Sequence, residues 1–265
     1  MIIVSTTNDE YAQHLGVMLT SLLKKTKNRD AINIYIIDGN ISADNKRKLN
    51  RVVGRYKKEI VFLTPATSLK EALPEDSTIG YITKETYFRI FLPTLLDNTI
   101  KKALYLDCDL IVRKDISELW DVNVENHALG AVDESVLFGW DKKERLMEEL
   151  GMPTDAPYFN AGVLLLNLER WRETDVSNRL VEYLQLHPNL TYMDQDALNA
   201  VLLNDWLPLD YKWNYTTYHW DPLPHIKPAI IHFCGWYKPW NSDIRFNKKY
   251  FKYLQLSQWN EDDDE

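Results

Sequence analysis

Apolar runs and segments of helical periodicity alternate along the first quarter of the chain. The runs at residues 2–4, 32–37 and 60–63 are short and end in polar or charged residues, which predicts buried strands. Between them, apolar side chains recur at helical spacing over residues 11–23 and 42–56. This β-α-β-α-β order predicts an α/β fold with a mostly parallel central sheet and helices on both faces.

The pattern continues through the rest of the chain without a repeat or a low-complexity linker. Further strands are predicted at residues 103–106, 129–132, 161–166 and 229–233, and further helices at 84–91, 142–150, 176–185 and 195–203. The helix at 84–91 is expected to stop before Pro93. We therefore expect a single domain over residues 1–258, followed by an acidic, disordered tail over residues 259–265.

Polar clusters occur at the ends of several predicted strands. They begin at Thr6, Asp107 and His232, each at or just past the end of an apolar run. In open α/β sheets, ligands bind beyond the carboxyl ends of the strands. We therefore expect these clusters to converge on one edge of the sheet and to form a binding site.

The triplet Asp107-Cys108-Asp109 is the strongest local signal for a metal site. In extended backbone, residues two apart point the same way, so both carboxylates can reach one cation while Cys108 faces away. Two neighbouring carboxylates repel each other, and a divalent ion relieves that repulsion. The alternative interpretation is an exposed acidic turn, because such a triplet alone is a weak motif.

The segment after the last predicted strand, HFCGWYKPW over residues 232–240, combines three useful groups. His232 offers a nitrogen ligand, Gly235 allows the backbone to approach a ligand closely, and Lys238 can contact a phosphate. A single histidine after a strand is more often structural. The presence of all three groups within seven residues favours a clamp around a ligand.

Two further positions suggest contacts to a polar ligand. Asn160 lies in an otherwise apolar segment, where its amide can satisfy backbone groups or bind sugar hydroxyls. Asp194 and Gln195 lie at the start of a predicted helix. Capping of that helix is the alternative role for Asp194.

Composition narrows the choice of function. The net charge is −8 and the chain has no basic stripe, which argues against a nucleic-acid partner. The only cysteines, Cys108 and Cys234, make no disulfide framework. No secretory signal is recognisable, and no apolar stretch approaches the ~20 residues that span a bilayer. We expect a cytoplasmic protein with reduced thiols and leave open peripheral contact with the inner face of the membrane.

Four motifs together resemble glycosyltransferase family 8. They are YLDCDLIV at residues 105–112, FNAGV at 159–163, DQDALN at 194–199 and HFCGWYKPW at 232–240. The family includes bacterial lipopolysaccharide α-galactosyl- and α-glucosyltransferases, glycogenin and plant galacturonosyltransferases. The resemblance covers almost the whole chain, and four motifs in order make it far more specific than the acidic triplet alone.

The resemblance implies a GT-A fold, in which a Rossmann-like sheet binds the nucleotide beside a small acceptor-side region. It implies Mn²⁺, with Mg²⁺ as an alternative, held by Asp107, Asp109 and His232. It also implies a nucleotide-sugar site, with uridine at Thr6, Asn8 and Tyr11, diphosphate at Gly235 and Lys238, and the donor region at Arg89, Cys108, Asn160, Ala161, Asp194 and Gln195. Asp133 matches an acceptor-side position.

The implied reaction is retaining transfer of a hexose from UDP-glucose or UDP-galactose to a carbohydrate-bearing acceptor, in lipopolysaccharide or other cell-surface glycan synthesis. Attack is expected on the leaving-group side, with Gln195 supporting the opposite face and Asp194 as the next candidate. Membrane-associated bacterial members often end in a basic, aromatic tail, whereas this chain ends in acidic residues, so membrane docking is not supported.

Two alternatives remain open at this point. One is a phosphoryl-transfer hydrolase of the haloacid dehalogenase type, although such motifs usually continue with a small residue and Asp109 is followed by Leu110. The other is a non-catalytic nucleotide-sugar-binding protein. The oligomeric state, the acceptor and the choice between glucose and galactose also stay open.

Overall fold

The computed structural model describes residues 1–74, 84–137 and 139–261. Within them, a seven-stranded sheet has the order β3-β2-β1-β4-β7-β6-β8. Its strands are β1 (Ile2–Asn8), β2 (Asn33–Gly39), β3 (Ile60–Leu63), β4 (Lys102–Leu106), β6 (Leu129–Asp133), β7 (Phe159–Asn167) and β8 (Trp206–Pro208). A smaller sheet has the order β5-β10-β9 and consists of β5 (Leu110–Val112), β10 (Ile230–His232) and β9 (Tyr215–Thr216).

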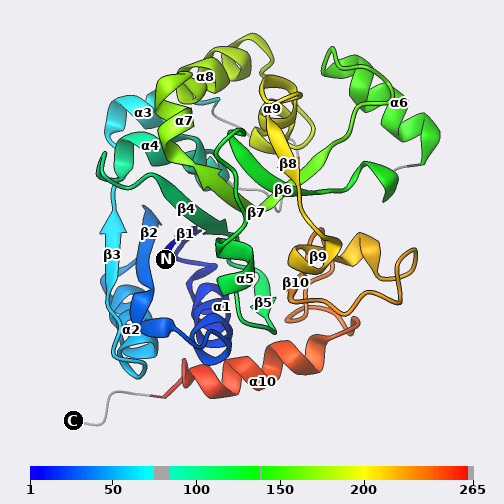
Figure 1. The fold of residues 1–265 in the computed structure, drawn as a ribbon. Helices are drawn as coiled ribbons and strands as arrows, with labels where there is room; N and C mark the ends of the chain where they lie inside the picture. The colour runs from blue at the N-terminus through cyan, green and yellow to red at the C-terminus, as the bar shows by residue number, and fades with distance from the viewer. Residues whose placement is uncertain (75–83, 138, 262–265) are drawn as a thin grey trace.

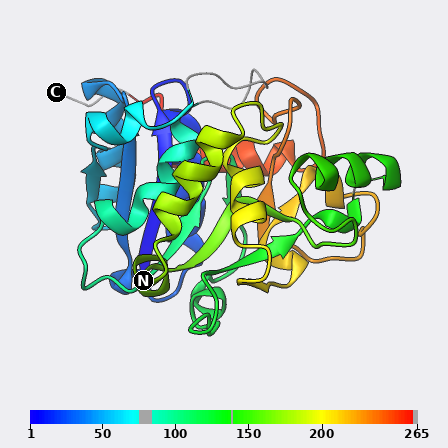
Figure 2. The same cartoon turned by 90° about the horizontal axis from the view of Figure 1, so that it is seen from above.

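Helices cover both faces of the large sheet (Figure 1). The described α-helices are α1 (Ala12–Lys25), α2 (Ala43–Gly54), α3 (Thr67–Glu71), α4 (Leu92–Leu95), α5 (Ser117–Trp120), α6 (Trp140–Glu149), α7 (Leu168–Glu173), α8 (Val176–Leu186), α9 (Asp194–Val201) and α10 (Asn247–Ser257). The 3-10 helices are η1 (Arg29–Ala31), η2 (Lys84–Phe91), η3 (Ser135–Leu137), η4 (Tyr211–Trp213) and η5 (Thr217–His219). In both views, α2 and α6 lie at opposite ends of the molecule (Figures 1 and 2).

The apolar strands are buried on both sides. In β7, Leu164 and Leu166 pack into the cluster with α7, α8 and α9, whereas Val163 and Leu165 pack into the cluster with α1 and α2. Successive side chains of a strand point to opposite faces, so a strand covered on both faces is a continuous apolar run. This confirms the predicted α/β class and the mostly parallel sheet.

One strand runs against its neighbours, and this reversal matters for the site. β7 is antiparallel to β4 and to β6, while β1, β2, β3 and β4 are mutually parallel. The register pairs Leu106 with Val163 and Asp133 with Phe159. The beginning of β7 therefore lies at the same sheet edge as the ends of β4 and β6.

The helix predicted over residues 84–91 is present as a 3-10 helix, but its predicted end before Pro93 is wrong. The chain continues directly into α4, with Pro93 in the first turn of that helix. Proline is tolerated there because the first amide groups of a helix have no intrahelical acceptor.

None of the described helices is both long and apolar enough to span a membrane.

The predicted tail begins too early. Trp259 is only 5% exposed and covers Gly16 of α1, where a Cβ atom would lie 2.8 Å from the indole Cε3. The end of α10 is held to α2 by Arg55, whose guanidinium donates to the carbonyls of Leu256 and Ser257 at 2.7 and 2.6 Å. The folded part thus includes Trp259, while residues 262–265 lie outside the described residues.

We predict that Trp259→Ala lowers the free energy of unfolding by about 3–5 kcal/mol, because it leaves a cavity over α1. Urea denaturation followed by circular dichroism measures this loss. Phe251→Ala is the matched control on α10, since Phe251 is 47% exposed, and it should change stability by at most about 0.5 kcal/mol. Equal losses in the two variants would show that Trp259 is not part of the core.

Candidate functional site

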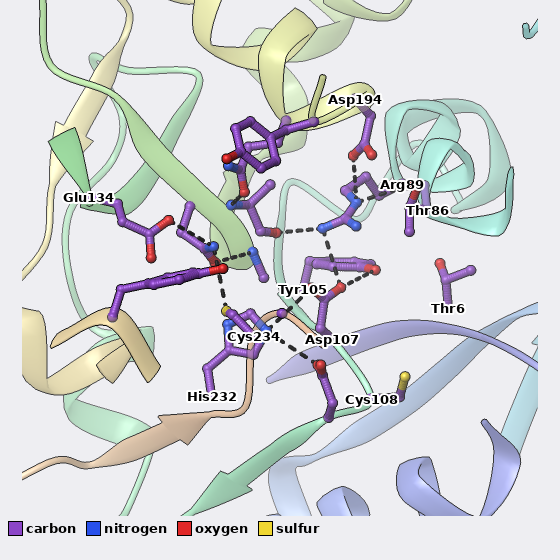
Figure 3. A pocket seen from close by; sticks show the side chains of 18 of the residues that line it. Thr6, Thr86, Arg89, Tyr105, Asp107, Cys108, Glu134, Asp194, His232 and Cys234 are labelled. Atoms are coloured by element: carbon purple, nitrogen blue, oxygen red, sulfur yellow. Dashed lines mark hydrogen bonds and ion pairs between the residues drawn. The ribbon is translucent and has the colours of Figure 1, made fainter. Parts of the chain in front are cut away.

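A cavity opens at the sheet edge where β1, β4 and β6 end and β7 begins (Figure 3). Residues from η2, from the start of α9 and from the segment after β10 complete its wall. The structure brings almost all of the sequence-predicted residues to this cavity: Thr6, Asn8, Tyr11, Arg89, Asp107, Cys108, Asp109, Asn160, Ala161, Asp194, Gln195, His232, Gly235 and Lys238.

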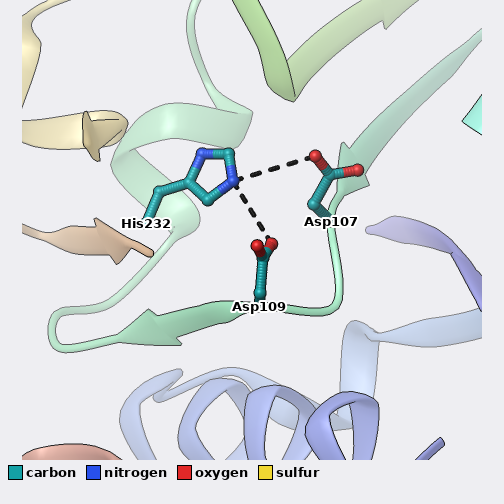
Figure 4. A group of neighbouring side chains, drawn as sticks. All are labelled: Asp107, Asp109 and His232. Atoms are coloured by element: carbon teal, nitrogen blue, oxygen red, sulfur yellow. Dashed lines mark ion pairs between the residues drawn. The ribbon is translucent and has the colours of Figure 1, made fainter. Parts of the chain in front are cut away.

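Asp107, Asp109 and His232 form a compact group (Figure 4). One potential ligand atom from each lies within 4.8 Å of the others, and no second such group occurs among the described residues. His232 Nε2 lies 3.2 Å from Asp109 Oδ1 and 3.8 Å from Asp107 Oδ2. The small sheet explains the contact, because antiparallel pairing places His232 opposite Leu110, the residue after Asp109.

The backbone around Cys108 differs from the extended form expected from the sequence. It bends at Cys108 and Asp109 between β4 and β5, and the two carboxylates still converge. Cys108 supplies no atom to the group of possible ligands, and both cysteines are free thiols. Burial raises the pKa of each thiol well above its usual value, so neither is an activated nucleophile.

A buried amide sets the orientation of the His232 ring. His232 Nδ1 lies 2.9 Å from Asn214 Oδ1, so Nδ1 donates its hydrogen to that oxygen and Nε2 is the ring nitrogen that faces the carboxylates. Asn214 Nδ2 donates in turn to Asn160 Oδ1 at 2.8 Å, and Asn160 Nδ2 donates to Glu134 Oε2 at 3.2 Å. Such outer partners fix the geometry of a metal-binding histidine.

Gly162 leaves the space that this group occupies. A Cβ atom there would lie 2.2 Å from His232 Cε1 and 2.8 Å from Asp107 Oδ2, so any side chain at this position would displace His232 or Asp107. Gly235 is also required by its backbone, because its φ of 84° lies in the left-handed region. The sequence motif contains Gly162, but its contact with a segment 70 residues later has no local signal.

Cations neutralise the carboxylates of the cavity. Lys238 Nζ lies 2.6 Å from Asp109 Oδ2, and Arg89 Nη1 lies 3.3 Å from Asp107 Oδ1. Burial would raise the pKa of Asp109, but Lys238 and His232 overcome this and lower it. Burial would lower the pKa of Lys238, but Asp109 raises it instead. Both groups therefore stay charged at neutral pH.

Arg89 joins the metal-ligand group to the start of α9. Its Nη1 donates to the carbonyl of Ala161 at 2.6 Å, and its Nε lies 2.8 Å from Asp194 Oδ2. Asp194 is buried, and desolvation raises its pKa to about 6 although Arg89 opposes the rise. The residue before it, Met193, has a φ of 53°, a conformation that non-glycine residues rarely adopt. Asp194 is therefore an ion-pair partner of Arg89, and it is the first residue of α9, whose N-cap Met193 has no side-chain capping bond.

Gln195 is held at both ends of its amide. Its Oε1 accepts a hydrogen bond from the Ala161 amide at 3.0 Å, and its Nε2 donates to the Tyr158 hydroxyl at 3.1 Å. At the opposite end of the cavity, Thr6 Oγ1 is buried and has no hydrogen-bond partner among the described residues. An unpaired buried hydroxyl in a cavity wall indicates a place for a polar ligand atom.

Asp133, the acceptor-side position expected from the resemblance, does not line the cavity, whereas its neighbour Glu134 does. The Asp133 carboxylate accepts hydrogen bonds from the amides of Ser135 and Tyr158 at 2.8 and 3.3 Å and does not line the cavity. Glu134 lines it, is only 3% exposed and has a pKa raised by burial. The acceptor-side role of Asp133 stays a prediction. The sequence analysis missed Glu134, although it directly follows the end of β6, where ligands bind in open α/β sheets.

Comparison with known proteins supports one family over the whole chain. The model of glycosyltransferase family 8 matches residues 2–244. General stress protein A of Bacillus subtilis (strain 168) is 35% identical over 280 residues, covering 98% of this chain and 95% of that protein. Lipopolysaccharide 1,3-galactosyltransferase of Salmonella typhimurium (strain LT2) is 28% identical over 239 residues, covering 86% and 69% of the two chains.

A solved structure gives the same result for the fold. The galactosyltransferase LgtC, in complex with donor and acceptor sugar analogs, matches with a TM-score of 0.83 and 26% identity, covering 97% of this chain and 96% of that chain. The central sheet with its single reversed strand therefore has the GT-A fold. The chain belongs to glycosyltransferase family 8.

Proposed function

We propose that the protein transfers a hexose, glucose or galactose, from a UDP-sugar to a hydroxyl group of a glycan, glycolipid or glycoprotein, with retention of the anomeric configuration. The convergence of Asp107, Asp109 and His232 with the cations of Arg89 and Lys238 on one cavity carries the proposal. Its relatives include a lipopolysaccharide 1,3-galactosyltransferase, which favours a hexose donor.

The residues present fit a divalent cation. Two carboxylates and one imidazole, oriented by Asn214 with Nε2 free to bind, form a mixed ligand set that suits Mn²⁺, with Mg²⁺ as the alternative. When bound, the cation neutralises negative charge on the departing nucleoside diphosphate. We assign its binding to Asp107, Asp109 and His232.

The other residues of the cavity wall bind successive parts of the donor. Uridine binds at the end formed by Thr6, Asn8 and Tyr11, where the Tyr11 ring is held edge-on to Trp240 at 6.0 Å. The diphosphate lies against Gly235 and Lys238, whose ammonium group stabilises the growing negative charge. The hexose lies among Arg89, Asn160 and Asp194.

The transfer itself breaks the bond between the anomeric carbon and the diphosphate oxygen and forms a bond from that carbon to the acceptor oxygen. The acceptor hydroxyl attacks on the side of the leaving group, and its proton passes to the departing diphosphate. Gln195 supports the opposite face through its amide carbonyl, which is polar but weakly nucleophilic. Asp194 is the next candidate for this role.

Turnover of a UDP-sugar distinguishes the proposed function from the two alternative functions. Membership of glycosyltransferase family 8 argues against a phosphoryl-transfer hydrolase. A non-catalytic nucleotide-sugar-binding protein would bind the donor but release no UDP from it. A panel of UDP-sugars with Mn²⁺, assayed for UDP release with and without simple sugar acceptors, tests the proposal and identifies the hexose.

We predict that Asp109→Asn lowers turnover and Mn²⁺ affinity by more than about 100-fold, beyond the effect of changing an outer partner of a metal ligand. Isothermal titration with Mn²⁺ and the UDP-release assay measure the two effects. Asp44→Asn is the control, because Asp44 lies on the exposed face of α2. Full wild-type activity in excess chelator would contradict the metal assignment.

We predict that Gly162→Ala lowers Mn²⁺ affinity at least about tenfold, because its methyl group displaces the His232 ring. Titration calorimetry with Mn²⁺ measures the loss, and circular dichroism checks the fold. Gly54→Ala is the control, since nothing lies within 4 Å of the added methyl group. Unchanged Mn²⁺ affinity in Gly162→Ala would remove His232 from the ligand set.

We predict that Gln195→Ala lowers kcat at least about tenfold while the KM for the donor stays within about threefold, because its interaction grows as positive charge develops. Steady-state kinetics measures both constants, and NMR of the anomeric proton should show an α-linked product. A β-linked product would contradict retention. Unchanged kcat would exclude Gln195 and make Asp194 the candidate.

A further inference from the structure

Behind Gln195, a second pair of buried polar groups lies outside the cavity wall. The Tyr158 hydroxyl accepts from Gln195 Nε2 at 3.1 Å and donates to Asp196 Oδ1 at 2.6 Å. Both Tyr158 and Asp196 are fully buried, and neither lines the cavity. Neither the family motif nor the proposed mechanism assigns them a role.

The chain of hydrogen bonds has a direction. Asp196 Oδ2 accepts from the Tyr192 amide at 2.6 Å and Oδ1 accepts from the Tyr158 hydroxyl, so both oxygens act as acceptors, as they do in an ionised carboxylate. The hydroxyl hydrogen of Tyr158 must therefore point to Asp196. Its oxygen is left to accept, and the group facing it on Gln195 must be the NH₂.

The hydrogen bond at the other end of the Gln195 side-chain amide requires the same orientation. The Ala161 amide donates to Gln195 Oε1 at 3.0 Å, which only a carbonyl oxygen can accept. Asn199 holds the two elements in register, because it accepts from the Phe159 amide at 2.8 Å and donates to the carbonyls of Phe159 and Gln195 at 2.9 and 2.8 Å. If the Gln195 amide were flipped, its NH₂ group would face the N–H group of Ala161, so two donors would oppose each other. Its carbonyl oxygen would then face the Tyr158 oxygen, which would lose its hydrogen-bond donor.

We propose that Tyr158 and Asp196 are positioning residues that fix the Gln195 side chain with its carbonyl oxygen at the cavity. The inference rests on the proposed function, in which this carbonyl faces an anomeric carbon of growing positive charge. The carbonyl end of the amide stabilises that charge, whereas the NH₂ end would repel it. Orientation, as well as presence, of the amide therefore governs the rate.

A double-mutant cycle tests this role. Tyr158→Phe should lower kcat about 10- to 100-fold, as the loss of an outer partner does at metal sites. The KM for the donor should stay within about threefold, because Tyr158 does not touch the donor. In the Gln195→Ala background, the same change should alter kcat by less than about twofold, since its target is already gone. Equal reductions in both backgrounds would overturn the proposal.

The matched control is Tyr183→Phe. Tyr183 also packs beside α9, and its hydroxyl donates to the Leu150 carbonyl at 3.1 Å, away from Gln195. It should leave kcat within about twofold of the wild type in both backgrounds. A loss as large as that of Tyr158→Phe would mean that any hydrogen-bonded tyrosine hydroxyl beside α9 affects the rate, which would overturn the specific role.

A measurement without substrate separates this inference from the proposed function. In protein with ¹⁵N-labelled glutamine, the side-chain NH₂ signals of Gln195 are assigned by their disappearance in Gln195→Ala. Hydrogen exchange of these signals should be slow in the wild type and at least about tenfold faster in Tyr158→Phe. Unchanged exchange would overturn the positioning role. Absence of turnover with every UDP-sugar would overturn the proposed function alone.

Discussion

The cavity depends on backbone contacts made by the first residues of β7. The Ala161 carbonyl accepts from Arg89, and the Ala161 amide donates to Gln195. The Gly162 carbonyl accepts from the Asp107 amide at 2.9 Å, and Gly162 leaves room for His232. Four segments distant in sequence thus take their positions from two adjacent residues, Ala161 and Gly162. Because these groups belong to a strand buried between two helical layers, they cannot shift separately.

The reversal of β7 makes this arrangement possible. In a wholly parallel sheet, the active edge receives only the loops that follow strands. Here an antiparallel strand adds its own beginning, and a beginning offers backbone groups as well as side chains. The small sheet has a similar effect, since the antiparallel pairing of β10 with β5 places His232 beside Asp109. Two reversals therefore concentrate ligand groups that a parallel sheet alone would leave dispersed.

The parts that the sequence predicted are those encoded locally or carried by motifs. Apolar runs located β1, β2, β3 and β4, and nearly every residue that the resemblance named lies in the cavity wall. The features that the sequence did not predict depend on contacts between distant segments of the chain. Gly162 is required because His232 and Asp107 lie against it, and Trp259, which the sequence analysis assigned to an acidic tail, is buried against α1. Short strands such as β5, β8 and β9 have too few residues for a periodicity, so only their pairing identifies them.

Two buried carboxylates outside the reacting groups share a physical role. Glu134 ends the chain of amides that orients His232, and Asp196 ends the chain that orients Gln195. A carboxylate only accepts hydrogen bonds, so it imposes a direction on every donor that leads to it. Burying such groups costs free energy, and burial raises the pKa of both. That cost is consistent with a cavity in which the direction of each dipole decides whether a developing charge is stabilised or opposed.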